Sequence, residues 1–108
     1  MESCTGWSVV NEITNIKNSR KVLKLSAVTY SNEFKIKMGV SKETIDKYSV
    51  YSLEAAKEMS KQISLFSNSD YEIGITGKLN KPDEINLFGY DIEYLLVFMI
   101  KNMINIIQ

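Results

Sequence analysis

The sequence predicts an α/β fold with a largely parallel sheet. Two segments, Val22–Tyr30 and Tyr71–Gly77, are apolar and rich in β-branched residues, which is typical of buried strands. Between them lie three segments that each follow a serine, the pattern of capped helices. Because strands and helices alternate along 108 residues, we expect one domain in which helices connect parallel strands.

The first predicted element is a helix from Gly6 to Ile16. Its apolar residues recur close to helical spacing, at Val9, Val10, Ile13 and Ile16. A short hydroxyl side chain before the helix, Ser3 or Thr5, is expected to cap it by accepting from the free amides of the first turn. A polar loop then leads to the strand at Val22–Tyr30.

Three further helices are predicted after that strand. Ser31 is expected to cap residues 32–38, which end at Gly39, and Ser41 to cap residues 42–48. Ser52 opens the longest helix, over residues 53–66. In this helix one apolar face is formed by Leu53, Ala56, Met59, Ile63 and Phe66.

The end of the chain is more apolar than the rest. After the strand at Tyr71–Gly77, residues 78–84 are expected to form a loop that contains the only proline. Residues 94–108 are very apolar and are predicted to form a helix that must be buried or paired. This tail is too short and too interrupted to span a bilayer, which needs about 20 apolar residues.

The composition excludes several function classes. The chain has no histidine, which removes Ser-His-Asp and Cys-His mechanisms, so acid–base chemistry must use Lys, Tyr, Asp or Glu. Thirteen basic and thirteen acidic residues cancel, so we expect neither nucleic acid nor membrane as a partner. One cysteine and no basic-then-apolar leader before Glu2 favour a cytoplasmic protein.

The first cluster of polar residues is Ser3, Cys4, Thr5 and Gly6, directly before the first helix. A serine at a helix start can attack a carbonyl while nearby amides stabilise the oxyanion. The alternative is an ordinary helix cap. Cys4 fits either a reactive thiolate or, more simply, a small buried side chain.

Two more clusters follow the predicted strands. Tyr30, Ser31, Asn32 and Lys35 stand where the first strand gives way to a helix, and ligands of α/β sheets bind at such strand ends. Lys35 is the natural base for a serine nucleophile, unless it is a solvated surface lysine. The third cluster, Gly74–Lys78, is either a ligand-binding turn or a plain turn, and it lacks the Walker spacing.

Together these clusters resemble a known family. The stretches "ESCTG", "AVTYSNEFKIKMGVSKETIDKYSVYSLEAAKEMS" and "GITGK" are similar to the C-terminal domain of the CinA family, the nicotinamide-nucleotide amidases. The resemblance covers residues 1–89. It implies a three-layer α/β/α sandwich that converts nicotinamide mononucleotide to nicotinate mononucleotide and ammonia, with no metal or cofactor.

The resemblance also assigns roles to residues. Ser3 would be the nucleophile, and Tyr30 and Lys35 would complete the catalytic site. The substrate-binding residues implied are Thr5, Gly6, Asn32, Thr76 and Gly77. The amides of Thr5 and Gly6 would serve either the oxyanion or the substrate phosphate. We also expect a homo-oligomer.

The sequence departs from the family pattern at both ends, so we expect an incomplete sandwich. The family's first helix and strand have no counterpart before Glu2, and Trp7 replaces a glycine. We interpret the apolar tail, residues 90–108, as a possible frameshift product, which the downstream nucleotide sequence tests. Weak or lost activity is therefore expected, and two alternatives stay open: a non-catalytic gene fragment, or an interaction module that dimerises through its tail.

Overall fold

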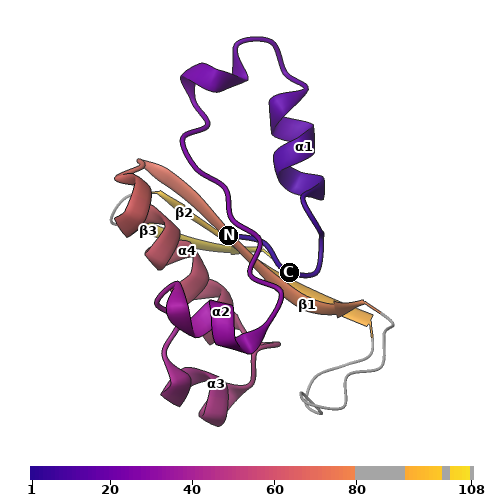
Figure 1. Cartoon of the computed structure of the whole chain (residues 1–108), viewed down its shortest axis with the longest axis vertical. Coiled ribbons are helices and arrows are strands. Elements are labelled where there is room, and N and C mark those ends of the chain that lie inside the picture. The colour runs from indigo at the N-terminus through magenta and orange to yellow at the C-terminus, as the bar shows by residue number, and fades with distance from the viewer. Residues whose placement is uncertain (80–91, 101–102, 108) are drawn as a thin grey trace.

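The computed structural model describes residues 1–79, 92–100 and 103–107, with the side chains of residues 1–78. Figure 1 shows the elements, which in chain order are α1 (Ser8–Thr14), the 3₁₀ turn η1 (Ser19–Lys21), α2 (Asn32–Lys37), α3 (Lys42–Tyr48), α4 (Leu53–Ser67), β1 (Tyr71–Leu79), β2 (Ile92–Ile100) and β3 (Met103–Ile107). Of the predicted loop at 78–84, Lys78 and Leu79 belong to β1, and the rest lies outside the described residues.

The three named strands form an antiparallel sheet in the order β1-β2-β3. Tyr71 pairs with Ile100 at one end of β1, and Leu79 pairs with Ile92 at the other. The prediction of a largely parallel sheet is therefore wrong for these strands. Only residues 101–102 separate β2 from β3, whereas a parallel connection needs a dozen residues or more.

The predicted helix in the tail is also wrong, because residues 94–100 lie in β2 and residues 103–107 form β3. A continuous apolar run has no periodicity that separates a buried helix from a buried strand. The β-branched and aromatic residues of the run, such as Val97, Phe98 and Ile104, favour the strand. The frameshift hypothesis for this tail stays a prediction.

A short parallel pairing joins the start of the chain to the segment around Val28. The Glu2 amide donates to Ala27 O at 2.8 Å, and the Thr29 amide donates to Glu2 O at 2.9 Å. This pattern is a parallel bridge between Glu2 and Val28. The strand predicted over residues 22–30 is thus reduced to this one bridge.

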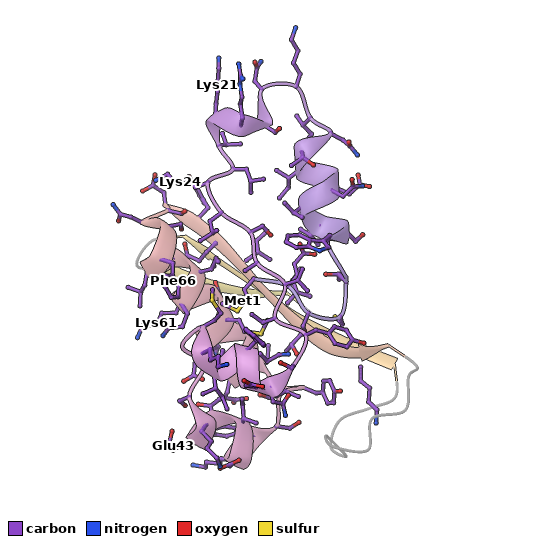
Figure 2. All side chains as sticks on the ribbon, viewed as in Figure 1. Met1, Lys21, Lys24, Glu43, Lys61 and Phe66 are labelled. Atoms are coloured by element: carbon purple, nitrogen blue, oxygen red, sulfur yellow. The ribbon has the colours of Figure 1, made fainter. Side chains whose placement is uncertain are left out.

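The other side of the same terminal segment pairs with β1. The α-amino group of Met1 donates to Ile73 O at 2.5 Å, and the Ile75 amide donates to Met1 O at 3.0 Å. Residues 1–3 therefore lie between residues 27–29 and β1 and run parallel to both, and Figure 2 shows Met1 in the middle of the molecule. Burial lowers the pKa of the Met1 amine from 8.0 to about 6, because the charged form is desolvated.

The three predicted serine caps at residues 31, 41 and 52 are confirmed. The hydroxyls of Ser31, Ser41 and Ser52 accept from the amides three residues later, at 3.1–3.2 Å. The three helices that follow lie within one residue of the predicted bounds at each end. Capping depends on residues three apart, so local sequence is sufficient to place these helix starts.

Helix α4 packs directly on the sheet, against β1 and β2. Of the predicted apolar face, Ala56, Met59 and Ile63 are buried, but Phe66 is 61% exposed and points to solvent (Figure 2). The contact is close because Gly74 of β1 has no side chain: a Cβ there would lie 2.1 Å from Ala56 O. The main chains of helix and strand therefore touch at this position.

The packing of a three-layer sandwich is only partly present. Helix α3 packs on α4, and Figure 1 shows α2, α3 and α4 together on one side of β1. Helix α1 is separated from β1 by a pocket and contacts η1 instead. In the described part of the chain, one helical layer is thus packed on the sheet and the second is not.

Candidate active site

Ser3 and Lys35 lie at the same end of the parallel segment. Residues 1–3 pair with residues 27–29 on one side and with β1 on the other. The next carbonyl oxygens that this pairing would use are Thr29 O on the first side and Ile75 O on the second. Both carbonyls accept from side chains at this point: Thr29 O from Lys35, and Ile75 O from Ser3. The structure therefore brings the predicted nucleophile and base to one strand end.

Lys35 is almost fully buried, with 3% of its surface exposed. Its Nζ donates to Thr29 O at 2.6 Å and to Tyr30 O at 3.3 Å. The lysine reaches these carbonyls because the Ser31 cap starts α2 just after the extended segment, which turns residue 35 back toward the strand end. The alternative of a solvated surface lysine is wrong.

Ser3 is also buried, at 6% exposed, and its hydroxyl donates to Ile75 O at 3.3 Å. This hydrogen bond is long, so little energy holds the hydroxyl to that acceptor. Thr29 is buried at the same strand end, and among the described residues no hydrogen-bond partner is found for its Oγ1. Ser3, Thr29 and Lys35 thus all have buried side chains at the end where the terminal segment leaves the sheet.

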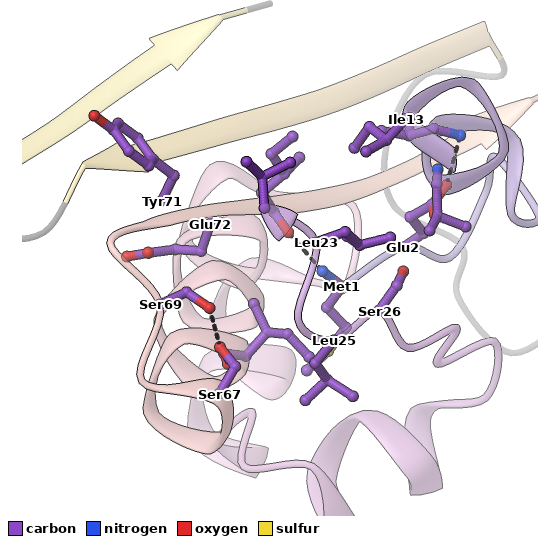
Figure 3. Close-up of a pocket in the computed structure, with 15 residues that line it drawn as sticks. Met1, Glu2, Ile13, Leu23, Leu25, Ser26, Ser67, Ser69, Tyr71 and Glu72 are labelled. Atoms are coloured by element: carbon purple, nitrogen blue, oxygen red, sulfur yellow. Dashed lines mark hydrogen bonds between the residues drawn. The ribbon is translucent and has the colours of Figure 1, made fainter. Parts of the chain in front are cut away.

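The loop after Ser3 is held by Glu2. The Thr5 hydroxyl donates to Glu2 Oε1 at 2.6 Å. The amides of Val9 and Val10 donate to the same carboxylate at 3.1 and 3.3 Å, and Figure 3 shows Glu2 at the edge of the pocket. The expected hydroxyl cap on this helix is therefore wrong, because Glu2 satisfies the amides. The helix itself is shorter than predicted, Ser8–Thr14 instead of 6–16.

This carboxylate affects where an anion can bind. A substrate phosphate placed at the start of α1 would meet a negative group that already accepts from the free amides there. The start of α1 is therefore a poor site for the substrate phosphate, which is one of the two ligands predicted for the Thr5 and Gly6 amides. Gly6 itself is exposed and adopts φ +52°.

The remaining predicted residues are distributed around the strand end. Tyr30 accepts from Lys35 through its carbonyl, and its side chain is 72% exposed. Asn32 is the first residue of α2 and is half-buried. Thr76 and Gly77 are buried in β1, directly after Ile75, and the Thr76 hydroxyl donates to Val50 O at 2.8 Å.

The family model of the CinA C-terminal domain matches residues 1–83, which include the whole strand end just described. The chain belongs to the CinA family.

Curated relatives support this membership over the same region. A CinA-like protein of Endomicrobium trichonymphae is 44% identical over 77 residues, which is 70% of this chain and 18% of that protein. A CinA-like protein of Thermosipho melanesiensis is 40% identical over 77 residues, again 70% of this chain and 19% of that protein. The CinA-family chain thus spans about a fifth of the length of these relatives.

Solved structures share the fold. A CinA superfamily protein from Enterobacter cloacae aligns with a TM-score of 0.87 at 23% identity, over 97% of this chain and 62% of that one. A competence/damage inducible protein from Agrobacterium tumefaciens aligns with a TM-score of 0.83 at 25% identity, over 98% and 64%. The aligned share includes most of the tail, so β2 and β3 belong to the CinA fold.

Trp7 has a backbone conformation that is unusual for a large side chain. It precedes α1 with φ 72° and ψ 0°, a left-handed conformation that costs L-residues about 1–2 kcal/mol. We expect Trp7→Gly to be more stable than Trp7→Ala by about 1 kcal/mol, because both lose the ring and only glycine relieves the strain.

Urea denaturation of the two variants measures this difference. The ring is 51% exposed, so its loss has a modest effect that is common to both variants. Equal midpoints for Trp7→Gly and Trp7→Ala would show that the loop adopts another conformation.

Cys4 follows Ser3 in the chain and is half-buried. Burial raises the pKa of the Cys4 thiol, and the nearby Lys35 charge only partly opposes this effect. A raised pKa leaves less thiolate at neutral pH, so Cys4 is a poor nucleophile here. The interpretation as a small buried side chain is the better one.

A pocket of about 270 Å³ lies away from Ser3 and Lys35, between α1, β1 and the end of α4 (Figure 3). Its walls are mainly aliphatic: Val9, Val10, Ile13, Val22, Leu23, Leu25, Ile63 and Ile73. The sequence alone does not reveal it, because five separate segments assemble it. The pocket lies beside the opposite, amino-terminal end of the parallel segment, at Met1 and Glu2.

The described residues offer neither a cluster of metal ligands nor a membrane-spanning helix. They contain no group of three or more His, Cys, Asp or Glu side chains that could hold a metal ion. No helix among them has the length and apolar character needed to cross a membrane.

Proposed function

We propose that this CinA-family chain hydrolyses the amide of nicotinamide mononucleotide to nicotinate mononucleotide and ammonia. The observation that carries the proposal is the pair of buried groups at one strand end, the Ser3 hydroxyl and the Lys35 amine. The chain has no histidine, so the base for a serine nucleophile must be Lys, Tyr, Asp or Glu, and Lys35 is the buried amine at the same strand end as Ser3. Family membership supports the same assignment.

The chemistry follows a two-step acyl transfer. Neutral Lys35 Nζ takes the proton of Ser3 Oγ, which attacks the amide carbon, and the carbonyl oxygen becomes an oxyanion. The nitrogen leaves as ammonia after it receives the proton from Lys35, and an ester joins Ser3 to the nicotinoyl group. Water, deprotonated by Lys35, then cleaves this ester and restores the hydroxyl. In this scheme Lys35 Nζ gives up its longer hydrogen bond, to Tyr30 O, and forms one with Ser3 Oγ instead.

The other predicted residues contact the substrate in this scheme. The exposed Tyr30 ring lies where a ligand can reach it, and we assign it to positioning or relaying the proton. Main-chain amides of Thr5 and Gly6 are assigned to the oxyanion, because they follow the proposed nucleophile, Ser3, within three residues of the chain. Asn32, Thr76 and Gly77 line the substrate. The Thr76 hydroxyl donates to Val50 O and can still accept a hydrogen bond from a ligand.

A single-turnover assay tests the proposal at the low activity that we expect. Purified chain, shown to be folded by circular dichroism, is mixed with a smaller molar amount of nicotinamide mononucleotide. Nicotinate mononucleotide and ammonia should appear in equal amounts, and analytical ultracentrifugation of the same sample measures the expected homo-oligomer. A folded chain that forms neither product would contradict the amidase and favour a non-catalytic fragment or interaction module.

A further inference from the structure

Glu2 connects three parts of the molecule from a buried position, with 3% of its surface exposed. Its main chain pairs with residues 27–29, as described above, and its neighbour in sequence is Ser3. Its carboxylate accepts from the Thr5 hydroxyl and from two amides of α1. These bonds close a ring of the chain from residue 2 to residue 10, and the Ser3 loop lies inside that ring.

The loop in this ring needs an external tether. Gly6 and Trp7 are consecutive residues with positive φ, a conformation that local sequence does not favour at Trp7. The shortest of the carboxylate bonds, 2.6 Å from Thr5 Oγ1 to Oε1, lies directly before this pair. A hydrogen bond to a charged group contributes more than a neutral one, so Glu2 is the strongest restraint on the turn.

The helix does not by itself explain why a buried carboxylate is placed here. Helix α1 has seven residues and none of them is buried, so fixing this helix in place adds little to the hydrophobic core. A local serine or threonine is sufficient to cap such a helix, as at the three other α-helices. What the long-range cap adds is a fixed relation between the strand end at Ser3 and the start of α1.

We propose that Glu2 is a positioning residue for Ser3, an inference that rests on the proposed amidase function. Its carboxylate holds the loop of residues 3–7 so that the Ser3 hydroxyl stays at the strand end beside Lys35. Misplacement of a nucleophile by about 1 Å is enough to slow a reaction about 10²-fold. Glu2 therefore affects turnover without contacting the substrate.

The test uses Glu2→Gln and Thr5→Val in the full chain, with Thr14→Val as the matched control. Glu2→Gln keeps the side-chain shape but loses one acceptor oxygen, and Thr5→Val removes the shortest bond. Thr14→Val removes the hydrogen bond to Asn11 O at the other end of α1, far from the loop. In single-turnover assays with the protein in excess, we expect the rate at saturating protein to fall about 10²-fold for Glu2→Gln. The half-saturating protein concentration should stay close to that of the parent, and the control should be unchanged.

A second readout does not depend on turnover. Cys4 lies inside the loop, so its alkylation by iodoacetamide reports how often the loop opens. Besides burial, the Glu2 charge also raises the pKa of the Cys4 thiol, so the decisive variant is Thr5→Val, which keeps this charge and which we expect to accelerate alkylation about tenfold. Unchanged alkylation in Glu2→Gln and Thr5→Val overturns the inference, because the carboxylate then does not restrain the loop. Faster alkylation together with the parent rate of turnover also overturns it, because the loop then opens without displacing Ser3. A parent that is itself inactive refutes the proposed function, while alkylation still decides whether Glu2 holds the loop.

Discussion

Ser3→Ala should abolish the release of ammonia from nicotinamide mononucleotide and leave the fold in place. Without Oγ no acyl-enzyme forms, so we expect the single-turnover rate to fall about 10³-fold or more. The variant loses only a 3.3 Å hydrogen bond to Ile75 O, which contributes about 1 kcal/mol at most. Ammonia release and a urea denaturation curve, measured on the same preparation, separate the two effects.

Cys4→Ala is the matched control for the nucleophile. The thiol is the adjacent reactive group, but its raised pKa makes it a poor thiolate, so this variant should keep the parent rate. If Ser3→Ala keeps its activity and Cys4→Ala loses it, the nucleophile has been misassigned.

Lys35 requires two substitutions, because its removal also affects the fold. Lys35→Met leaves the buried Thr29 O without its 2.6 Å donor, at a cost of about 1–3 kcal/mol. Lys35→Arg retains donors for the carbonyls, but the guanidinium stays protonated and so cannot accept the proton of Ser3 Oγ. Both variants should be inactive, and a folded Lys35→Arg protein with parent turnover would exclude lysine as the base.

Gly74→Ala should destabilise the chain more than any substitution in the loop. The new Cβ would lie 2.1 Å from Ala56 O and 2.7 Å from the Ser60 amide nitrogen, both main-chain atoms of α4. The helix would have to move off the sheet, so we expect a loss of about 3 kcal/mol. For a domain of this size that corresponds to a melting temperature about 12 °C lower or more, measured by circular dichroism.

Gly6→Ala provides the comparison for Gly74→Ala. Gly6 has φ +52°, and a Cβ added there would have nothing within 4 Å, so alanine meets only backbone strain of about 1 kcal/mol. Equal melting temperatures for the two variants would mean that α4 does not lie against β1 at Gly74.

The candidate site was partly predictable from the sequence. The motifs pointed to Ser3 and Lys35, and the structure places both residues at one strand end. The role of the Glu2 side chain was missed, although an acidic residue shortly before a predicted helix is a signal for capping. The direction of Phe66 was also missed, since helical spacing alone does not show where the packed face ends.

The sequence by itself determined the features that depend on neighbours a few residues apart. The three serine caps, the helices that follow them, the absence of histidine chemistry and the CinA motifs were all readable in this way. Only the tertiary structure decided how strands pair: the Met1 amine meets Ile73 O, 72 residues away, and the apolar tail forms strands instead of a helix. A cap is satisfied within one turn of helix, whereas a strand's partner is chosen by the packing of the whole chain, and residues 1–3 find theirs between two segments that are distant in sequence.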